Sequence, residues 1–398
     1  MIKHLFKLVW NRKRSNLLIM LEIFVSFIVM FAVITLGVYY ADNYNQPLGF
    51  TYENVWNISI DMQTGTDDYW SPEMVNTTRQ LYLALQEFPE IEVAAGAHTA
   101  PYSLGNRTSV NVYEGKRVEM EVNEVTDDFQ KVMGVQLLQG RWFEKSDDAL
   151  NWKPVIINQR LARAVFGDED PVNQNYRPWA SDEEDHRVIG VVNDFRKDGE
   201  FSGLGNYLFE RKRLDDPKSR PPANLLIKVR PGTPAEFEER LMSKLQAVAR
   251  EWSFEISPLV RMREDAFKIR LIPLIILGLI AGFLMLMVGL GLVGVLWQNV
   301  TQRIKEIGLR RAKGAAAEDI YKQILGELVV LATFGLALGA LLVVQLPLLD
   351  LISFIRPPVY FLSMVIALLV IYGLTLTAGL YPSWLATRVQ PAEALHYE

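Results

Sequence analysis

The chain has 398 residues, of which 50% are hydrophobic and 22% are charged, and its formal net charge is −5. This charge gives no basic footprint for nucleic acid, and the absence of cysteine excludes thiol catalysis, disulfides and thiolate-ligated zinc. The histidines are His4, His98, His186 and His396, too scattered for a metal site, so we expect no metal, cofactor or nucleic-acid partner.

The chain begins with a basic segment, residues 1–16, in which apolar residues alternate with lysines at helical spacing. This pattern predicts an amphipathic helix lying in the cytoplasmic membrane interface. The apolar run Leu17–Tyr40 follows, and it is long enough to cross about 30 Å of hydrocarbon. It is longer than a usual signal-peptide core, and no small-x-small cleavage site precedes Asp42, so we predict a retained anchor.

Residues 41–268 carry ordinary charge density and are predicted to form one extracytoplasmic α+β domain. Residues 52–97 show the order strand, helix, strand, and Ser71 is the predicted cap of the helix. Residues 223–258 repeat this order, and a capping box beginning at Thr233 is predicted to start the second helix. Two such units predict a split βαβ subdomain of ferredoxin-like type.

Residues 98–222 lie between the two units and are predicted to form a β-rich insert with short helices. The acids Asp61, Asp67 and Asp68 do not have the spacing of a calcium loop, so solvated loop positions are the better interpretation. No Gly-x-Ser-x-Gly elbow occurs, so a membrane-anchored enzyme is disfavoured and we expect no catalytic residue.

Three further apolar runs follow the domain and are long enough to span a membrane: Leu271–Trp297, Gln323–Leu346 and Val359–Pro382. Together with the first run they predict four transmembrane helices. Two pairs of glycines at spacing four, Gly278 with Gly282 and Gly335 with Gly339, are predicted to allow close helix packing.

The distribution of Lys and Arg predicts the orientation. Basic residues concentrate in residues 1–16 and 298–322, whereas the connection 347–358 has only Arg356. Both termini, including the tail 383–398, are therefore predicted to be cytoplasmic, with residues 41–268 and 347–358 outside. Four basic residues just outside the second span go against this rule: Arg261, Arg263, Lys268 and Arg270.

Three parts of the chain carry motifs of one known family. They are the cytoplasmic run Gln302–Ala315, the tail Tyr381–Leu395, and the outer stretches Gly140–Phe143, Val155–Asn158 and Val188–Phe195. These parts resemble the MacB/FtsX-like permeases of ATP-binding-cassette (ABC) systems. The run is similar to the family's R-x-x-E-I-G-I-R-R-A-x-G-A motif, the tail to its Y-P-A ending, and the outer stretches to its extracytoplasmic domain. In family terms the split βαβ unit would be the porter-like subdomain.

The resemblance implies a non-catalytic permease subunit of the cytoplasmic membrane that works in efflux by mechanotransmission. The loop 298–322 would dock the ATPase through these residues: Arg303, Glu306, Ile307, Gly308, Arg310, Arg311 and Gly314. A positive-inside anchor is the alternative for this loop. Only sixteen residues precede the first span and no Gly-x-x-x-x-Gly-Lys-Ser/Thr motif occurs, so a separate ATPase chain is expected.

The other expected partners are membrane lipid and a second permease copy or a sibling permease, which would form a dimer. A periplasmic adaptor is left open. The alternative function is an FtsX-like signalling or regulatory complex that controls a cell-wall hydrolase or senses peptides.

Overall fold

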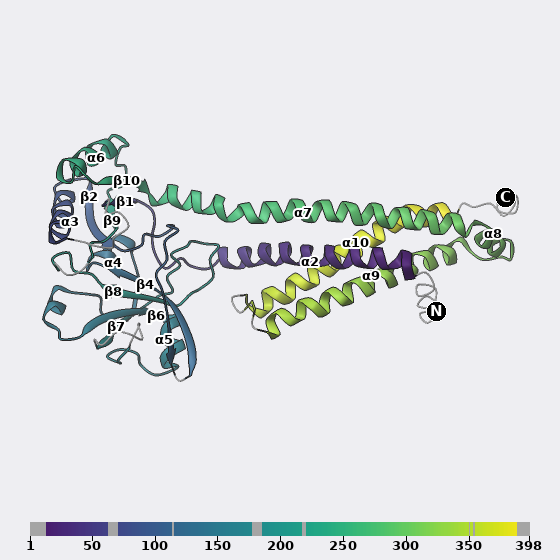
Figure 1. The fold of residues 1–398 in the computed structure, drawn as a ribbon, viewed down its shortest axis with the longest axis horizontal. Helices are drawn as coiled ribbons and strands as arrows, with labels where there is room; N and C mark the ends of the chain where they lie inside the picture. Colours follow the sequence, from purple (N-terminus) through teal and green to yellow (C-terminus); the bar gives the residue numbers. More distant parts are fainter. Residues whose placement is uncertain are drawn as a thin grey trace. The chain divides into compact units, whose positions relative to one another are not determined.

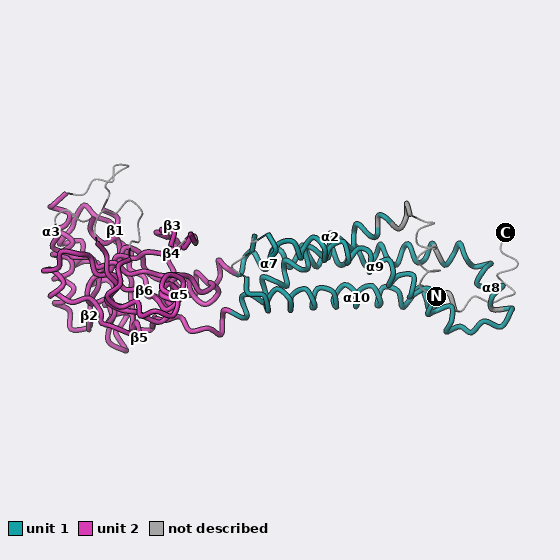
Figure 2. The backbone as a smooth tube through the Cα atoms, turned by 90° about the horizontal axis from the view of Figure 1, so that it is seen from below, with its two compact units in different colours: residues 1–42, 271–398 teal, residues 43–270 magenta. Residues whose placement is uncertain are grey.

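The computed structural model describes residues 13–62, 71–113, 115–176, 185–216, 220–349, 351–352 and 355–387. Most of the amphipathic helix predicted at residues 1–16, and most of the tail 383–398, lie outside these ranges. The chain divides into two compact units, of which the first joins residues 1–42 to 271–398 and the second is residues 43–270 (Figure 2).

Within these described ranges, four helices are long and apolar enough to cross a membrane, which confirms the predicted number of spans. They are α2 (Lys13–Tyr44), α7 (Leu259–Gln302), α9 (Ala317–Leu348) and α10 (Pro357–Thr387) (Figure 1). A short helix, α8 (Ile304–Ala312), connects α7 to α9. With 44 residues, α7 extends beyond the predicted apolar run at both ends.

The first unit has an apolar core to which all four long helices contribute. Phe27 of α2, Leu292 of α7, Ala332 of α9 and Ile371 of α10 are fully buried in it. Helix α7 nevertheless contributes little of its surface, because only 11% of its most apolar window is buried, against 39% for α9. Most of the apolar surface of α7 is therefore left for lipid or for another protein.

The second unit contains one ten-stranded sheet, and four of its strands form the predicted split βαβ subdomain. These strands lie in the order β10–β1–β9–β2, antiparallel at each step: β10 (Ser253–Pro258), β1 (Val55–Asp61), β9 (Asn224–Val229) and β2 (Ile91–Ala97). Helices α3 (Pro72–Leu85) and α6 (Glu236–Val248) bury apolar side chains with this part of the sheet. The predicted ferredoxin-like arrangement is therefore confirmed.

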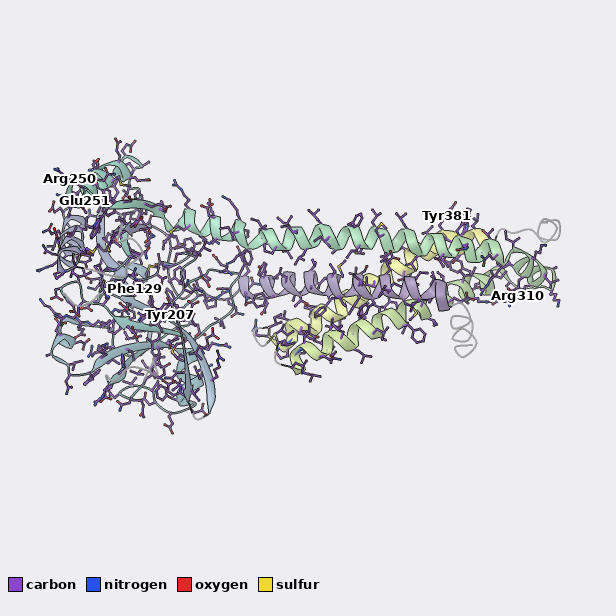
Figure 3. All side chains as sticks on the ribbon, viewed as in Figure 1. Phe129, Tyr207, Arg250, Glu251, Arg310 and Tyr381 are labelled. Carbon is purple, nitrogen blue, oxygen red and sulfur yellow. The ribbon has the colours of Figure 1, made fainter. Side chains whose placement is uncertain are left out.

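The insert is β-rich as predicted, and its strands continue the same sheet. They are β3 (Thr108–Tyr113), β4 (Lys116–Val125), β5 (Leu137–Gly140), β6 (Lys153–Asn158), β7 (His186–Val192) and β8 (Tyr207–Arg211). The order from β2 is β4–β8–β6–β7–β5, and β3 pairs with β4. In the part of the insert that the structure describes, three short helices accompany them: α4 (Phe129–Met133), η1 (Lys145–Ala149) and α5 (Gln159–Phe166). Phe129 and Tyr207, marked in Figure 3, belong to the buried aromatic core of this unit.

The two predicted helix caps have different outcomes. Ser71 caps α3, because its side chain accepts a hydrogen bond from the Met74 amide at 3.3 Å. The capping box at Thr233 is wrong. The Thr233 hydroxyl donates to the Arg230 carbonyl at 2.7 Å, and α6 starts after Ala235 without a side-chain cap. The hydroxyl closes the preceding turn and is therefore not available to the helix amides.

Candidate coupling site

Helix α8 lies at the end of α7, and one face of it packs into the helical core. Ile307 is buried with Val300 of α7 and with Ile320 and Ile324 of α9. Gly308 is also buried. Ile307, one of the residues predicted to dock the ATPase, thus packs inside this chain against the two long helices that α8 connects.

The charged residues of this region form a continuous set of hydrogen bonds to α9. Nη1 of Arg303 lies 2.8 and 3.0 Å from the two carboxylate oxygens of Glu327. Glu327 also accepts from the Gln323 amide at 3.2 Å, and Gln323 in turn accepts from Arg310 at 2.8 Å. Arg310, marked in Figure 3, pairs with Glu306 one turn before it at 2.6 Å.

This network changes how the predicted docking residues are interpreted. Arg303 and Glu327 are only 14% and 15% exposed, so their ion pair is largely desolvated. Arg303, Glu306 and Arg310 satisfy their charges within the chain, which fixes α8 to α9. The sequence interpretation missed Gln323 and Glu327, although a carboxylate just inside a predicted span was a visible signal for a buried ion pair.

Other residues of α8 remain open to solvent. Lys305 and Lys313 are exposed, and the Leu309 side chain is 51% exposed. Gly314 follows the helix with φ of +93°, a conformation that favours glycine. Of Arg311, only the backbone is described, as part of α8.

The two glycine pairs differ in their surroundings. A Cβ on Gly335 would lie 2.9 Å from the Met20 carbonyl oxygen, and one on Gly339 would lie 2.5 Å from the Phe27 ring. This pair therefore lets α9 approach α2 closely. Gly278 and Gly282 have no atom within 4 Å of such a Cβ, so α7 makes no close contact there with the described part of the chain.

Comparison with known protein families identifies the chain. The MacB-like periplasmic core domain matches residues 17–243, and the FtsX-like permease C-terminal domain matches residues 278–391. The chain belongs to the MacB/FtsX-like ABC transporter permeases. It is accordingly a membrane permease with an extracytoplasmic domain, and no group of three or more His, Asp or Glu in the described ranges could hold a metal ion.

Several curated relatives are similar over much of the chain. The macrolide export ATP-binding/permease protein MacB of Bordetella avium is 27% identical over 297 residues, covering 72% of this chain and 44% of the relative. MacB 2 of Aeromonas hydrophila is 25% identical over 358 residues, covering 85% and 52%. The chain thus spans about half the length of the curated relatives it matches.

A crystal structure of the periplasmic region of MacB from Actinobacillus actinomycetemcomitans was also matched. It has 16% sequence identity and a TM-score of 0.40, and the match covers 55% of this chain and 94% of that one.

Proposed function

We propose that this chain is the permease subunit of an ABC-type efflux or extraction system, in which a separate chain hydrolyses ATP and the permease transmits the movement. The observation that carries this proposal is the attachment of α8 to α9. Through Ile307 and the Arg303–Glu327 pair, a push on α8 acts on α7 and α9 together. Closure of a partner ATPase would therefore move two spans as one body.

Helix α7 supports the mechanical part of the proposal. It is a single helix of 44 residues, about 66 Å long at the usual helical rise, and it begins directly after strand β10 of the extracytoplasmic domain. A displacement at its cytoplasmic end would reach that domain without crossing a loop. The predicted spans also contain few charged residues, Glu22 and Glu327, which favours movement over a hydrated path.

The remaining assignments belong to the same proposal. We place both termini and α8 on the cytoplasmic side of the cytoplasmic membrane, and residues 41–268 outside. Because four spans are few for a transporter, we propose a dimer with a second copy or a sibling permease. The open glycines Gly278 and Gly282 of α7 are candidates for that contact.

The exposed face of α8 is where the proposal can be tested. The full chain is tagged, purified from its native membrane, and its partners are identified by mass spectrometry. Replacing Lys305 and Leu309 with Ala removes a cation and an apolar contact, and we expect the yield of the ATPase partner to fall about tenfold. Leu83→Ala is the matched control, since Leu83 lies on extracytoplasmic α3 and is 50% exposed.

Unchanged ATPase recovery with the Lys305/Leu309 variant would show that α8 is only an anchor. The chain purified without partners should show no ATP turnover, and turnover by that preparation would contradict a separate ATPase.

A further inference from the structure

A pocket of about 380 Å³ opens in the second unit at the point where β10 continues into α7. Its walls are the loop 102–106, Asp198, the end of β10 and the first turns of α7. The volume lies within the range of small-molecule sites. None of the residues around it has a role in the coupling of α8.

One wall of the pocket is held by a buried lysine. The Lys197 side chain is 2% exposed, and its ammonium donates to the Gly105 carbonyl at 2.7 Å and to the Asn106 side chain at 2.5 Å. It also lies 3.1 Å from Asp198. These bonds fix the loop 102–106, so the pocket is formed before any ligand arrives.

The pocket presents apolar side chains that lie unusually open. Leu104, at the tip of the fixed loop, is 88% exposed, and Ile269 of α7 is 51% exposed. Met262 and Ala266, on the same face of α7, are half-buried beside them. Exposed apolar residues that gather at one cavity indicate an apolar ligand group.

Among the charged residues that line the pocket, one cation and one anion make no ion pair within the described part of the chain. Arg270 lies 3.6 Å from Asp198, and Lys268 lies 3.0 Å from Asp265. Arg261 and Glu255 also line the pocket, and neither has an ion pair within the described part of the chain. A ligand that carries both a negative and a positive group would satisfy them.

The chain places this pocket close to the membrane. Arg270 directly precedes the apolar run that begins at Leu271. At the helical rise of about 1.5 Å per residue, Arg261 lies about 15 Å further from that run along α7. The pocket therefore begins near the level of the lipid headgroups and extends away from it.

We propose that this pocket binds a zwitterionic phospholipid from the outer leaflet. The Arg261 guanidinium contacts the phosphate, since its planar donors match phosphate oxygens, and Glu255 contacts the ammonium. The acyl chains lie along Leu104, Met262 and Ile269. This assignment also gives a role to Arg261, one of the basic residues that lie outside the second span against the positive-inside rule.

Native mass spectrometry of the detergent-purified full chain tests the proposal, with dioctanoyl phosphatidylethanolamine as the probe. We expect Arg261→Gln and Glu255→Gln each to weaken binding about tenfold, as expected for the loss of one charged hydrogen bond. Arg250→Gln and Glu251→Gln are the matched controls and should bind as the parent does. Both lie just after α6, outside the pocket, and are exposed (Figure 3).

Two further probes separate the parts of the ligand. Dioctanoyl phosphatidylglycerol lacks the ammonium, so its binding should be weaker and should not respond to Glu255→Gln. Glycerophosphoethanolamine lacks acyl chains and should bind the parent chain poorly. Dioctanoyl phosphatidylethanolamine should in turn bind poorly to a Leu104→Asp variant.

Equal binding by the parent and both pocket variants overturns the proposal, and so does an equal loss in the Arg250 and Glu251 controls. Displacement of the lipid by a zwitterionic tripeptide at lower concentration would assign the pocket to peptides and would also overturn it. The assay needs no ATPase, so its failure leaves the proposed permease function untouched.

Discussion

Arg303, at the junction of α7 and α8, donates from one guanidinium nitrogen to both carboxylate oxygens of Glu327, 24 residues later on α9. Both side chains are about 85% buried, so neither charge is well solvated. Removing one partner would leave the other charge without compensation at the end of the helical unit.

We expect Glu327→Gln or Arg303→Gln to lower the free energy of unfolding by about 1.5–3 kcal/mol, the range for hydrogen bonds to charged groups. The double variant should lose less free energy of unfolding than the two single variants lose together. Thermal unfolding of the full chain in detergent measures this. Additive losses in the double-mutant cycle would show that the two residues do not interact.

The same variants test the coupling role separately from stability. The exchange Arg303→Glu with Glu327→Arg restores opposite charges, so it should recover part of the stability and of the ATPase turnover measured with the partner. Recovery of stability alone would mean that the pair holds the fold but does not transmit movement.

The glycine pairs give opposite expectations for one substitution. Gly335→Ala places a methyl group 2.9 Å from the Met20 carbonyl, which is backbone and cannot rotate away, so we expect a loss of about 1–3 kcal/mol. Gly278→Ala meets no described atom and should be neutral or slightly stabilising. Melting of both variants in detergent checks this. If Gly278→Ala lowers the stability of the dimer but not of the monomer, Gly278 lies at a contact between subunits.

The Glu124 carboxylate predicts a pH dependence of the extracytoplasmic domain. Burial alone would raise the pKa of Glu124, but Lys212, 2.6 Å away, and Arg107 hold that pKa below its usual value. Because the pKa is lower in the folded state, the stabilisation is complete above the unfolded value of about 4.3 and is lost as the pH falls through the folded pKa.

Glu124→Gln should therefore melt at a lower temperature than the parent at pH 7, by an amount that corresponds to about 2 kcal/mol. The difference should shrink below about pH 4. Near-UV circular dichroism follows the melting. Glu119→Gln, at an exposed position of the same strand, is the control and should show a small difference at every pH. A difference in melting temperature between Glu124→Gln and the parent that persists at low pH would exclude the ion-pair explanation.

Single-cysteine labelling tests the proposed orientation, because the chain contains no cysteine. Leu104→Cys, at an 88% exposed position, should react with an impermeant maleimide in intact spheroplasts, whereas Lys313→Cys should react only after lysis. Met120→Cys should stay unreactive until the domain is unfolded, since Met120 is 1% exposed. Labelling at position 313 before lysis would reverse the orientation.

The sequence alone predicted the spans and the order of strands and helices, because both depend on local patterns. A run of apolar residues long enough to cross a bilayer has few other stable environments, and its length identifies it. The strand–helix–strand units repeat similar signals, so the split βαβ subdomain could be recognised before its strands were seen to pair.

Side-chain partners were decided by the tertiary structure. Thr233 has the residue type of a cap, but a turn uses its hydroxyl. The sequence treats the two glycine pairs alike, yet only Gly335 and Gly339 have α2 beside them in the described chain. Glu306 and Arg310 were predicted to dock an ATPase, and only the structure shows that they are bonded to each other and, through Gln323, to α9.

The pocket beside Leu104 could not be predicted from the sequence either, because its walls come from segments near residues 104, 198 and 261. Spacing along one helix or strand determines which residues share a face, and the sequence contains that information. Contacts between residues far apart depend on how the helices and the sheet pack, and one hydrogen-bond donor has several possible acceptors until that packing is formed.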